Sequence, residues 1–344
     1  MLITPCISAL KAMLPEIEID VLLDETCAPV LRGHPLVNRV IEAPKGRGKI
    51  GKFTARLKTI RELRSRRYDL AVSLHGGPTS MILTRLSGAR STAGFAHHPA
   101  AWLMNLRAPH PSVIWDRENI HTVEGQLSIL KWLGVPMPSP PPPTSLAIDP
   151  DSDSAVRSIL QEHDLNGPFA IIHPCAGWES KQWRLEGFTE VIAYLREEHN
   201  LPSLVIGTPA DYPIISRIIS RAPATGLTDL LLAQTIALIS LASIFIGNDS
   251  GPAHIAAAFD IPQVVIYEKA EFASTWAPWT NAPNQSIIAE IKSDDLCPIT
   301  RCSPCRFPGC IRQVTVEQVI EAVDEVFCSA AEINACRPDR IGTS

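Results

Sequence analysis

The sequence lacks the features that would place it in a membrane or mark it for export. No apolar stretch approaches the roughly 20 residues that a membrane-spanning helix needs. The longest, residues 230–246, is interrupted by polar side chains. The N-terminus shows no basic segment followed by an apolar run and a cleavage site, so no signal peptide is recognisable. We therefore expect a cytoplasmic protein, whose nine cysteines are reduced thiols or metal ligands rather than a disulfide framework.

The sequence also lacks the common motifs of hydrolases and kinases. It contains no Gly-x-Ser-x-Gly, no His-Glu-x-x-His and no P-loop. The adjacent pair His97 and His98 has no further ligand at metal spacing and is predicted to lie at the surface. What is present is a chain of 344 residues with 45% hydrophobic and 19% charged residues, which is typical of a globular protein with two domains.

Short apolar strands alternate with amphipathic helices along both halves of the chain. This alternation predicts an α/β protein with parallel sheets. Residues 136–143 are rich in proline, which cannot join a helix or a central strand, so we place the domain boundary there. The predicted domains span residues 1–140 and 145–312, followed by a C-terminal helix at 313–336 that packs back on the first domain.

Charge is unevenly distributed along the chain. The net charge is −5, yet residues 45–67 contain ten Lys or Arg and one Glu. The apolar residues Phe53, Leu57, Ile60 and Leu63 recur there at helical spacing, which predicts a helix with one core face and one basic face. The basic face suggests an anionic surface as its partner, although a simply solvated helix face would give the same pattern.

The strongest local signal lies in residues 243–267. An apolar strand, a loop of small residues and a short helix beginning near Pro252 follow one another. Free N–H groups and the helix dipole make such a junction an anion site, which Asp249 and His254 would flank. The alternative is an ordinary turn in which Asp249 or Ser250 only caps the helix.

Residues 249–258 match the motif Asp-[Ser/Thr]-Gly-x-x-His-[Ile/Leu]-Ala-Ala-Ala. In this motif the chain resembles the ADP-heptose:lipopolysaccharide heptosyltransferase family. The resemblance implies a GT-B fold, in which two Rossmann-like domains with parallel sheets face a cleft. It also implies that the nucleotide sugar binds mainly to the C-terminal domain and the acceptor to the N-terminal domain.

The resemblance extends to a loop that follows the strand at 169–173. Lys181 and Trp183 match the family's Lys-x-Trp-Pro, while Arg184 stands in place of the Pro. The ammonium of Lys181 would neutralise the leaving diphosphate. We assign Lys181 and Asp249 catalytic roles on this basis. The expected donor-binding residues are Gly207, Asp211, Leu227, Asp249, Ser250, Gly251, Pro252 and His254. Asp211 stands where the family uses an acid for the ribose, but it could merely cap a helix.

The function implied by the resemblance is an inverting transfer of heptose from ADP-heptose to a lipopolysaccharide inner-core or lipid-linked acceptor. No cofactor is expected to be required and no nucleic acid is an expected partner. The basic helix would allow peripheral contact with the anionic inner face of the inner membrane. Two alternatives remain: a nucleotide-sugar-binding pseudoenzyme, and another GT-B sugar transferase or epimerase.

The opening of the chain departs from the family pattern. Residues 1–11 resemble the family's first helix, but the preceding strand and its Gly-Asp loop are missing. That Asp is the family's expected catalytic base, so we expect the general base upstream of Met1. Restoring it would require codons that precede the assigned start.

Four cysteines cluster near the end of the second predicted domain. Cys297, Cys302, Cys305 and Cys310 form a C-x4-C-x2-C-x4-C pattern, which could close a tetrahedral structural zinc site. The outer spacings are unusual for zinc, so a reduced thiol loop or a disulfide is the alternative.

Overall fold

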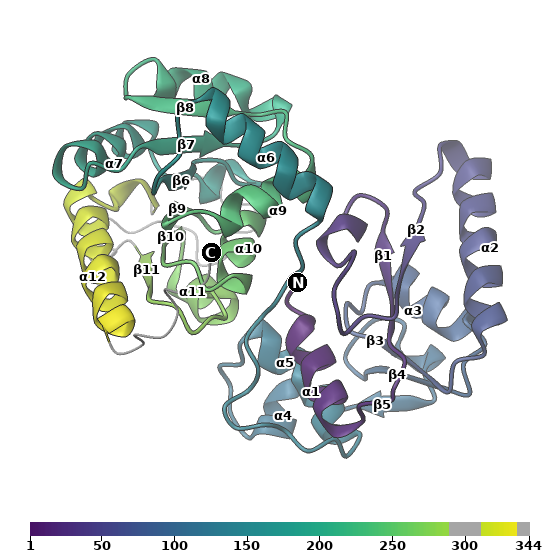
Figure 1. Cartoon of the computed structure of the whole chain (residues 1–344). Helices are drawn as coiled ribbons and strands as arrows, with labels where there is room; N and C mark the ends of the chain where they lie inside the picture. Colours follow the sequence, from purple (N-terminus) through teal and green to yellow (C-terminus); the bar gives the residue numbers. More distant parts are fainter. Residues whose placement is uncertain (289–310, 336–344) are drawn as a thin grey trace. The chain divides into compact units, whose positions relative to one another are not determined.

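The structure is a computed structural model that describes residues 1–288 and 311–335. The chain forms two compact units, Leu2–Pro142 and Pro143–Ser344, and the division falls within the proline-rich segment (Figure 1). Among the described residues, no helix combines the length and the apolar character that crossing a membrane requires.

The first unit alternates strands and helices, as the sequence predicts. Its strands are β1 (Asp20–Asp24), β2 (Arg39–Ala43), β3 (Leu70–Ser73), β4 (Ser91–Phe95) and β5 (Leu106–Ala108). Its α-helices are α1 (Thr4–Met13), α2 (Gly48–Arg66), α3 (Pro78–Leu86), α4 (Pro111–Trp115) and α5 (Thr122–Trp132). Two of the shortest elements, β5 and α4, were not predicted from the sequence.

The strands of the first unit form two separate parallel sheets within residues 2–142. One pairs β1 with β2, and the other has the order β3-β4-β5. All five residues of β1 remain partly exposed, because its side facing away from β2 has no strand to cover it.

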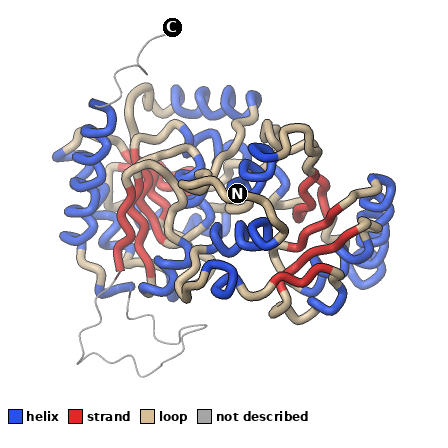
Figure 2. Tube along the Cα trace, turned by 90° about the horizontal axis from the view of Figure 1, so that it is seen from below, coloured by secondary structure: helices blue, strands red, loops and turns tan. Residues whose placement is uncertain are grey.

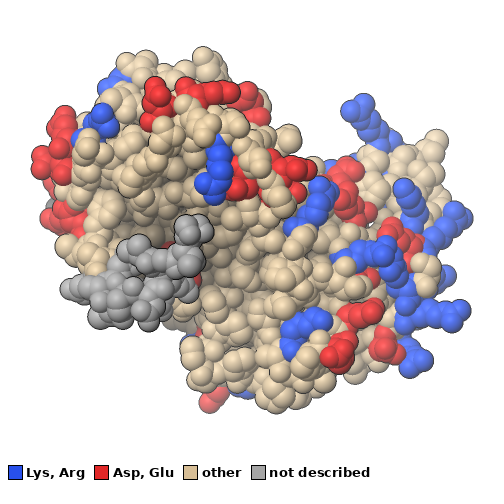
Figure 3. All heavy atoms as spheres, viewed as in Figure 1, with Lys and Arg blue, Asp and Glu red and all other residues tan. Residues whose placement is uncertain are grey.

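Helix α2 begins and ends close to the predicted bounds, but its apolar face is shorter than predicted. Thr59 and Leu63 are buried, whereas Ile50 and Phe53 are 81% and 63% exposed. The prediction that Phe53 belongs to the core was therefore wrong, because the buried residues of α2 lie only in its later turns. Figure 3 shows Lys and Arg gathered over the region of α2.

The second unit contains one sheet of six parallel strands in the order β11-β10-β9-β6-β7-β8. The strands are β6 (Ala170–His173), β7 (Ser203–Ile206), β8 (Ala224–Leu227), β9 (Ile244–Asn248), β10 (Gln263–Tyr267) and β11 (Asn284–Ile288). The α-helices are α6 (Pro150–Glu162), α7 (Leu185–Glu198), α8 (Tyr212–Ile219), α9 (Leu232–Ser240), α10 (Gly251–Ala258), α11 (Ala270–Trp276) and α12 (Val316–Ala335). Figure 2 shows this sheet between layers of helices.

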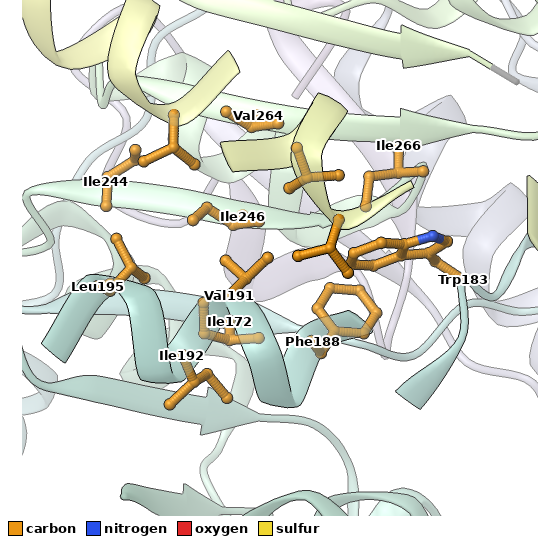
Figure 4. Packing of buried hydrophobic residues seen from close by; sticks show 14 of the residues in the cluster. Ile172, Trp183, Phe188, Val191, Ile192, Leu195, Ile244, Ile246, Val264 and Ile266 are labelled. Atoms are coloured by element: carbon orange, nitrogen blue, oxygen red, sulfur yellow. The ribbon is translucent and has the colours of Figure 1, made fainter. Parts of the chain in front are cut away.

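The core of the second unit lies between the sheet and the helices α7, α8 and α12. Every residue of β6, β7, β9 and β10 is buried, as expected for central parallel strands. Trp183 and Phe188 pack edge to face in this core with ring centroids 5.0 Å apart (Figure 4). A Cβ at Gly187 would lie 2.4 Å from the Trp183 ring, so only glycine leaves room for the indole.

Helix α12 packs against α7, β10 and β11 of the second unit. Val319, Val323 and Val326 are buried in the same core as Trp183. The helix thus completes the C-terminal domain. Its predicted contact with the first domain stays a prediction.

Candidate functional site

The candidate site lies where the strand order of the second unit reverses. The chain runs outward from β6 through β7 to β8, then returns to place β9 on the other side of β6. The loops that leave β6 and β9 therefore diverge to opposite faces of the sheet, and ligands of open α/β sheets bind at such a point. The two segments singled out in the sequence, 173–183 and 249–258, both begin there.

A buried asparagine holds these two segments together. Asn248 ends β9 and has no exposed surface. Its Oδ1 accepts a hydrogen bond from the backbone N–H of Trp183 at 3.1 Å, and its Nδ2 donates to the Pro174 carbonyl at 2.8 Å. The loop 174–183 is also anchored at its end, because Trp183 Nε1 donates to the Val314 carbonyl at 2.9 Å. These bonds fix the loop that carries Lys181.

Lys181 and Asp249 form an ion pair in the candidate site. The Lys181 ammonium lies 2.5 Å from Asp249 Oδ2, and the side chains are 22% and 8% exposed. The ammonium also lies 4.8 Å from the centroid of the Phe272 ring, within the range of a cation–π contact. The structure thus brings together the two residues to which the sequence analysis gave catalytic roles.

The start of α10 is open toward a ligand. Ser250 is its N-cap residue, yet within the described part of the chain its side chain makes no capping hydrogen bond. Its Oγ instead lies 3.0 Å from His173 Nδ1. Burial lowers the pKa of His173 to about 4, so the imidazole is neutral at pH 7. No described heavy atom lies within 4 Å of a Cβ built on Gly251, which leaves space where the helix dipole favours an anion.

Gly207, Asp211 and Leu227 meet at the carboxyl ends of β7 and β8. The Gly207 N–H donates to the Leu227 carbonyl at 3.1 Å. Asp211 Oδ2 accepts hydrogen bonds from the Thr208 N–H at 2.8 Å and from its hydroxyl at 2.6 Å. Burial acts to raise the pKa of Asp211, but these bonds from Thr208 outweigh it, so the pKa is lowered. Asp211 therefore does cap the turn at 209–211, while its contact with a ribose stays a prediction.

The thiol of Cys175 lies close to this carboxylate. Burial raises the pKa of Cys175 to about 12, and the charge of Asp211 adds to the effect. Cys175 is thus an inert buried thiol.

His254 and Pro252 lie in the first turns of α10. Pro252 lies in the first turn of α10, where backbone N–H groups have no partner within the helix. The missing N–H of proline therefore costs no helical hydrogen bond there. His254 is only 8% exposed, and its ring centroid lies 6.5 Å from that of Trp276. The imidazole is therefore part of the packing beneath α10, and its contact with a donor stays a prediction.

Two further residues of this region, Glu268 and Phe272, were not predicted from the sequence. Glu268 directly follows β10, is 5% exposed and accepts a hydrogen bond from Ser180 Oγ at 3.5 Å. Phe272 provides the ring beside Lys181. Glu268 comes directly after the buried strand β10 and Phe272 lies in the helix that follows it, and this position was the available signal, since ligand sites form at carboxyl ends of parallel strands.

The described residues offer no group of three or more His, Cys, Asp or Glu that could hold a metal ion. The four cysteines considered for zinc, Cys297, Cys302, Cys305 and Cys310, lie outside the described residues. A third histidine, His110, lies beside the pair His97 and His98. The ring centroid of His97 is 4.4 Å from that of His98 and 4.7 Å from that of His110. The two are therefore not an isolated pair.

Comparison with known proteins agrees with this geometry. Residues 56–298 match glycosyltransferase family 9 (heptosyltransferase). Lipopolysaccharide heptosyltransferase 3 of Escherichia coli K12 is 30% identical over 287 residues, which cover 81% of this chain and 82% of that protein. Lipopolysaccharide core heptosyltransferase OpsX of Haemophilus influenzae is 27% identical over 240 residues, covering 67% and 65%.

Solved structures show the same fold. A glycosyltransferase family 9 protein from Veillonella parvula superposes with a TM-score of 0.80 at 20% identity, over 95% of this chain and 93% of that one. The E. coli heptosyltransferase WaaC with ADP gives a TM-score of 0.70 at 19% identity, over 94% and 95%. The expected GT-B class is thus confirmed. With a family match over more than half of its length, the chain belongs to glycosyltransferase family 9, the heptosyltransferases.

Proposed function

We propose that this glycosyltransferase moves heptose, with inversion, from ADP-heptose to an acceptor sugar of the lipopolysaccharide inner core. The observation that carries the proposal is the Lys181–Asp249 pair beside the open start of α10. A positive charge and free backbone N–H groups at one point suit the diphosphate of a nucleotide sugar. The names of the similar proteins, lipopolysaccharide heptosyltransferases, support heptose and lipopolysaccharide as the substrates.

In the proposed reaction an acceptor hydroxyl oxygen forms a bond to the anomeric carbon of the heptose. The bond from that carbon to the diphosphate oxygen breaks, and ADP leaves with the electron pair. Lys181 and the backbone of Ser250 and Gly251 stabilise the negative charge that grows on the diphosphate. The hydroxyl proton passes to a general base, a role that we assign to no described residue.

Asp249 holds the Lys181 ammonium in place before the donor binds. Its carboxylate is 8% exposed, so the pair is shielded from water and the ammonium has a fixed position. When the diphosphate arrives, the ammonium has a second anion within reach. Asp249 therefore acts on the donor through Lys181, as a positioning residue.

The experiment is a transfer assay with ADP-heptose and lipopolysaccharide from a strain whose core keeps the acceptor sugar but lacks the heptose that is to be transferred. Mass spectrometry should detect one added heptose, and ADP should be released in equal amount. Donor binding without product would support the pseudoenzyme instead. A changed sugar nucleotide in the absence of acceptor would support an epimerase.

A further inference from the structure

A cavity of about 320 Å³ opens in the first unit, at the carboxyl ends of β1 and β2. This volume lies near the lower end of the roughly 300–1,000 Å³ typical of small-molecule sites. Its wall combines residues that follow the two strands with residues of α2 and α3. The ones that matter for its chemistry are Asp24, Lys45, Lys52, Arg56 and Leu83.

The lining is strongly basic. Its three cations and one carboxylate leave a net charge of +2. Lys45 is partly neutralised, since its ammonium lies 3.3 Å from Asp24 Oδ1. Lys52 and Arg56 belong to none of the ion pairs found among the described residues. Two cations of the wall are thus without a counter-charge from the protein.

The start of α2 is itself basic, which is unfavourable for a helix. The dipole of α2 places positive charge at its start, where acidic residues are normally preferred. This helix instead begins after Arg47 with Lys49 and Lys52 and has no acidic residue before Glu62. An anion bound at this end would offset the repulsion between the positive end of the helix dipole and these basic side chains.

Two glycines bring the loop after β2 against the first turn of α2. Gly46 has a φ of +61°, and a Cβ there would lie 2.3 Å from the Gly51 carbonyl oxygen. Only glycine allows this close approach, which carries Lys45 to the same cavity as Lys52. The cavity is therefore built by specific local geometry and not by a loose surface.

We propose that this cavity binds the phosphate monoester of a phosphorylated acceptor saccharide. The proposal rests on the proposed function, since it names a charged group of the acceptor. A phosphate monoester carries close to two negative charges at neutral pH and so matches the lining. The planar fork of Arg56 can bind two phosphate oxygens at once, and the buried Leu83 offers apolar surface to the sugar ring.

The test titrates the full chain with mannose 6-phosphate, mannose and ADP by calorimetry. One variant combines Lys52→Gln with Arg56→Gln, and the matched control combines Lys58→Gln with Arg61→Gln, which removes equal charge from α2 outside the cavity. We expect mannose 6-phosphate to bind and mannose not to bind. The cavity variant should bind the sugar phosphate at least about tenfold more weakly, because two charge-assisted contacts are lost. The control should stay within about twofold of the parent protein.

Two outcomes would overturn the proposal. In the first, both variants lose affinity equally, so that binding follows the overall charge of α2. In the second, the cavity variant keeps sugar phosphate binding but loses binding to phosphatidylglycerol vesicles, so that the cluster docks on lipid headgroups. The ADP titration separates this test from the proposed function, because ADP binding should be the same in all three proteins. If ADP binds to none of them, the donor site fails while the cavity result still stands.

Discussion

The ammonium of Lys181 lies 2.5 Å from Asp249 Oδ2, although 68 residues separate the two in the sequence. Lys181 lies in the loop that follows β6 and Asp249 directly follows the neighbouring strand β9, while Asn248 fixes the loop that carries Lys181. The pair provides charge at the start of α10, where we propose that the nucleotide diphosphate binds.

Lys181→Ala should lower kcat by about a hundredfold while weakening ADP binding much less, since leaving-group charge is largest in the transition state. The matched control is Arg217→Ala, an exposed residue on α8 of the same unit.

Asp249→Asn should also lower kcat. Because Asp249 acts through Lys181, the double variant should lose little more than Lys181→Ala alone. Losses that multiply would show that the two residues act independently.

Asn248→Ala should destabilise the second unit by roughly 2–3 kcal/mol, because two buried backbone groups lose their partners. Thermal unfolding measures the loss, and Asn281→Ala at an exposed position serves as the control. The variant should also bind ADP more weakly at temperatures where it is folded, since loop 174–183 is released. An unchanged melting temperature would show that the loop does not depend on Asn248.

Stability should fall as the pH drops below 6.5. Burial lowers the pKa of His173 to about 4 in the folded protein, so the unfolded chain takes up a proton first. The contribution of His173 is complete above pH 6.5 and is lost by pH 4, a change of roughly 3 kcal/mol in the free energy of unfolding. The free energy of unfolding is measured with urea at several pH values between 7.5 and 5. Its slope against pH should be shallower for His173→Gln than for the parent protein. The exposed His163→Gln should leave the slope as it is, and equal slopes in all three would contradict the assignment.

Hydrogen exchange should be faster in the first unit than in the second. The edges of β1 and β3 that face away from their partners are uncovered within residues 2–142, whereas β6 and β9 are paired on both sides. Amides of β1 and β3 should therefore open with a smaller free energy than those of β6 and β9. Mass spectrometry of peptides from both units measures this, and equal protection would mean that the uncovered edges have no energetic consequence.

The basic surface of α2 should bind anionic vesicles reversibly and lose binding as salt rises. Each exposed Lys or Arg near the vesicle contributes about 1 kcal/mol, so replacing Lys49, Lys58 and Arg61 by Gln should release the protein. Arg64 is left unchanged in this variant, because its Nε donates a hydrogen bond to the Leu86 carbonyl at 3.0 Å and supports the fold. Sedimentation of the variant with vesicles as efficiently as the parent protein would remove α2 from this role.

Part of the candidate site could be predicted from the sequence, because its geometry depends on residues that are close together in the chain. A buried strand, a loop of small residues and a helix start at 244–258 follow directly from neighbouring residue types, and the motif Asp249–Ala258 identified the family. The sequence also separated the two halves of the chain, since proline at 136–143 excludes helices and central strands.

Contacts between residues far apart in the chain could not be predicted from the sequence. The role of Asn248 depends on which loop lies beside β9, and that depends on the strand order of the whole sheet. The exposure of Phe53 depends on which turns of α2 are buried by the rest of the unit, although its helical spacing suggested a core position. The cavity at Lys52 likewise requires β1, β2 and two helices to be placed together.

The sequence by itself thus determined the alternation of strands and helices, the domain division and the family motif at 249–258, because each is encoded by residues close together in the chain. The tertiary structure alone decided that Lys181 pairs with Asp249, that Ser250 turns to His173 instead of capping α10, and that the cations of α2 line a cavity. These contacts join residues far apart in sequence. Their formation depends on how parallel strands pair, which no local pattern specifies.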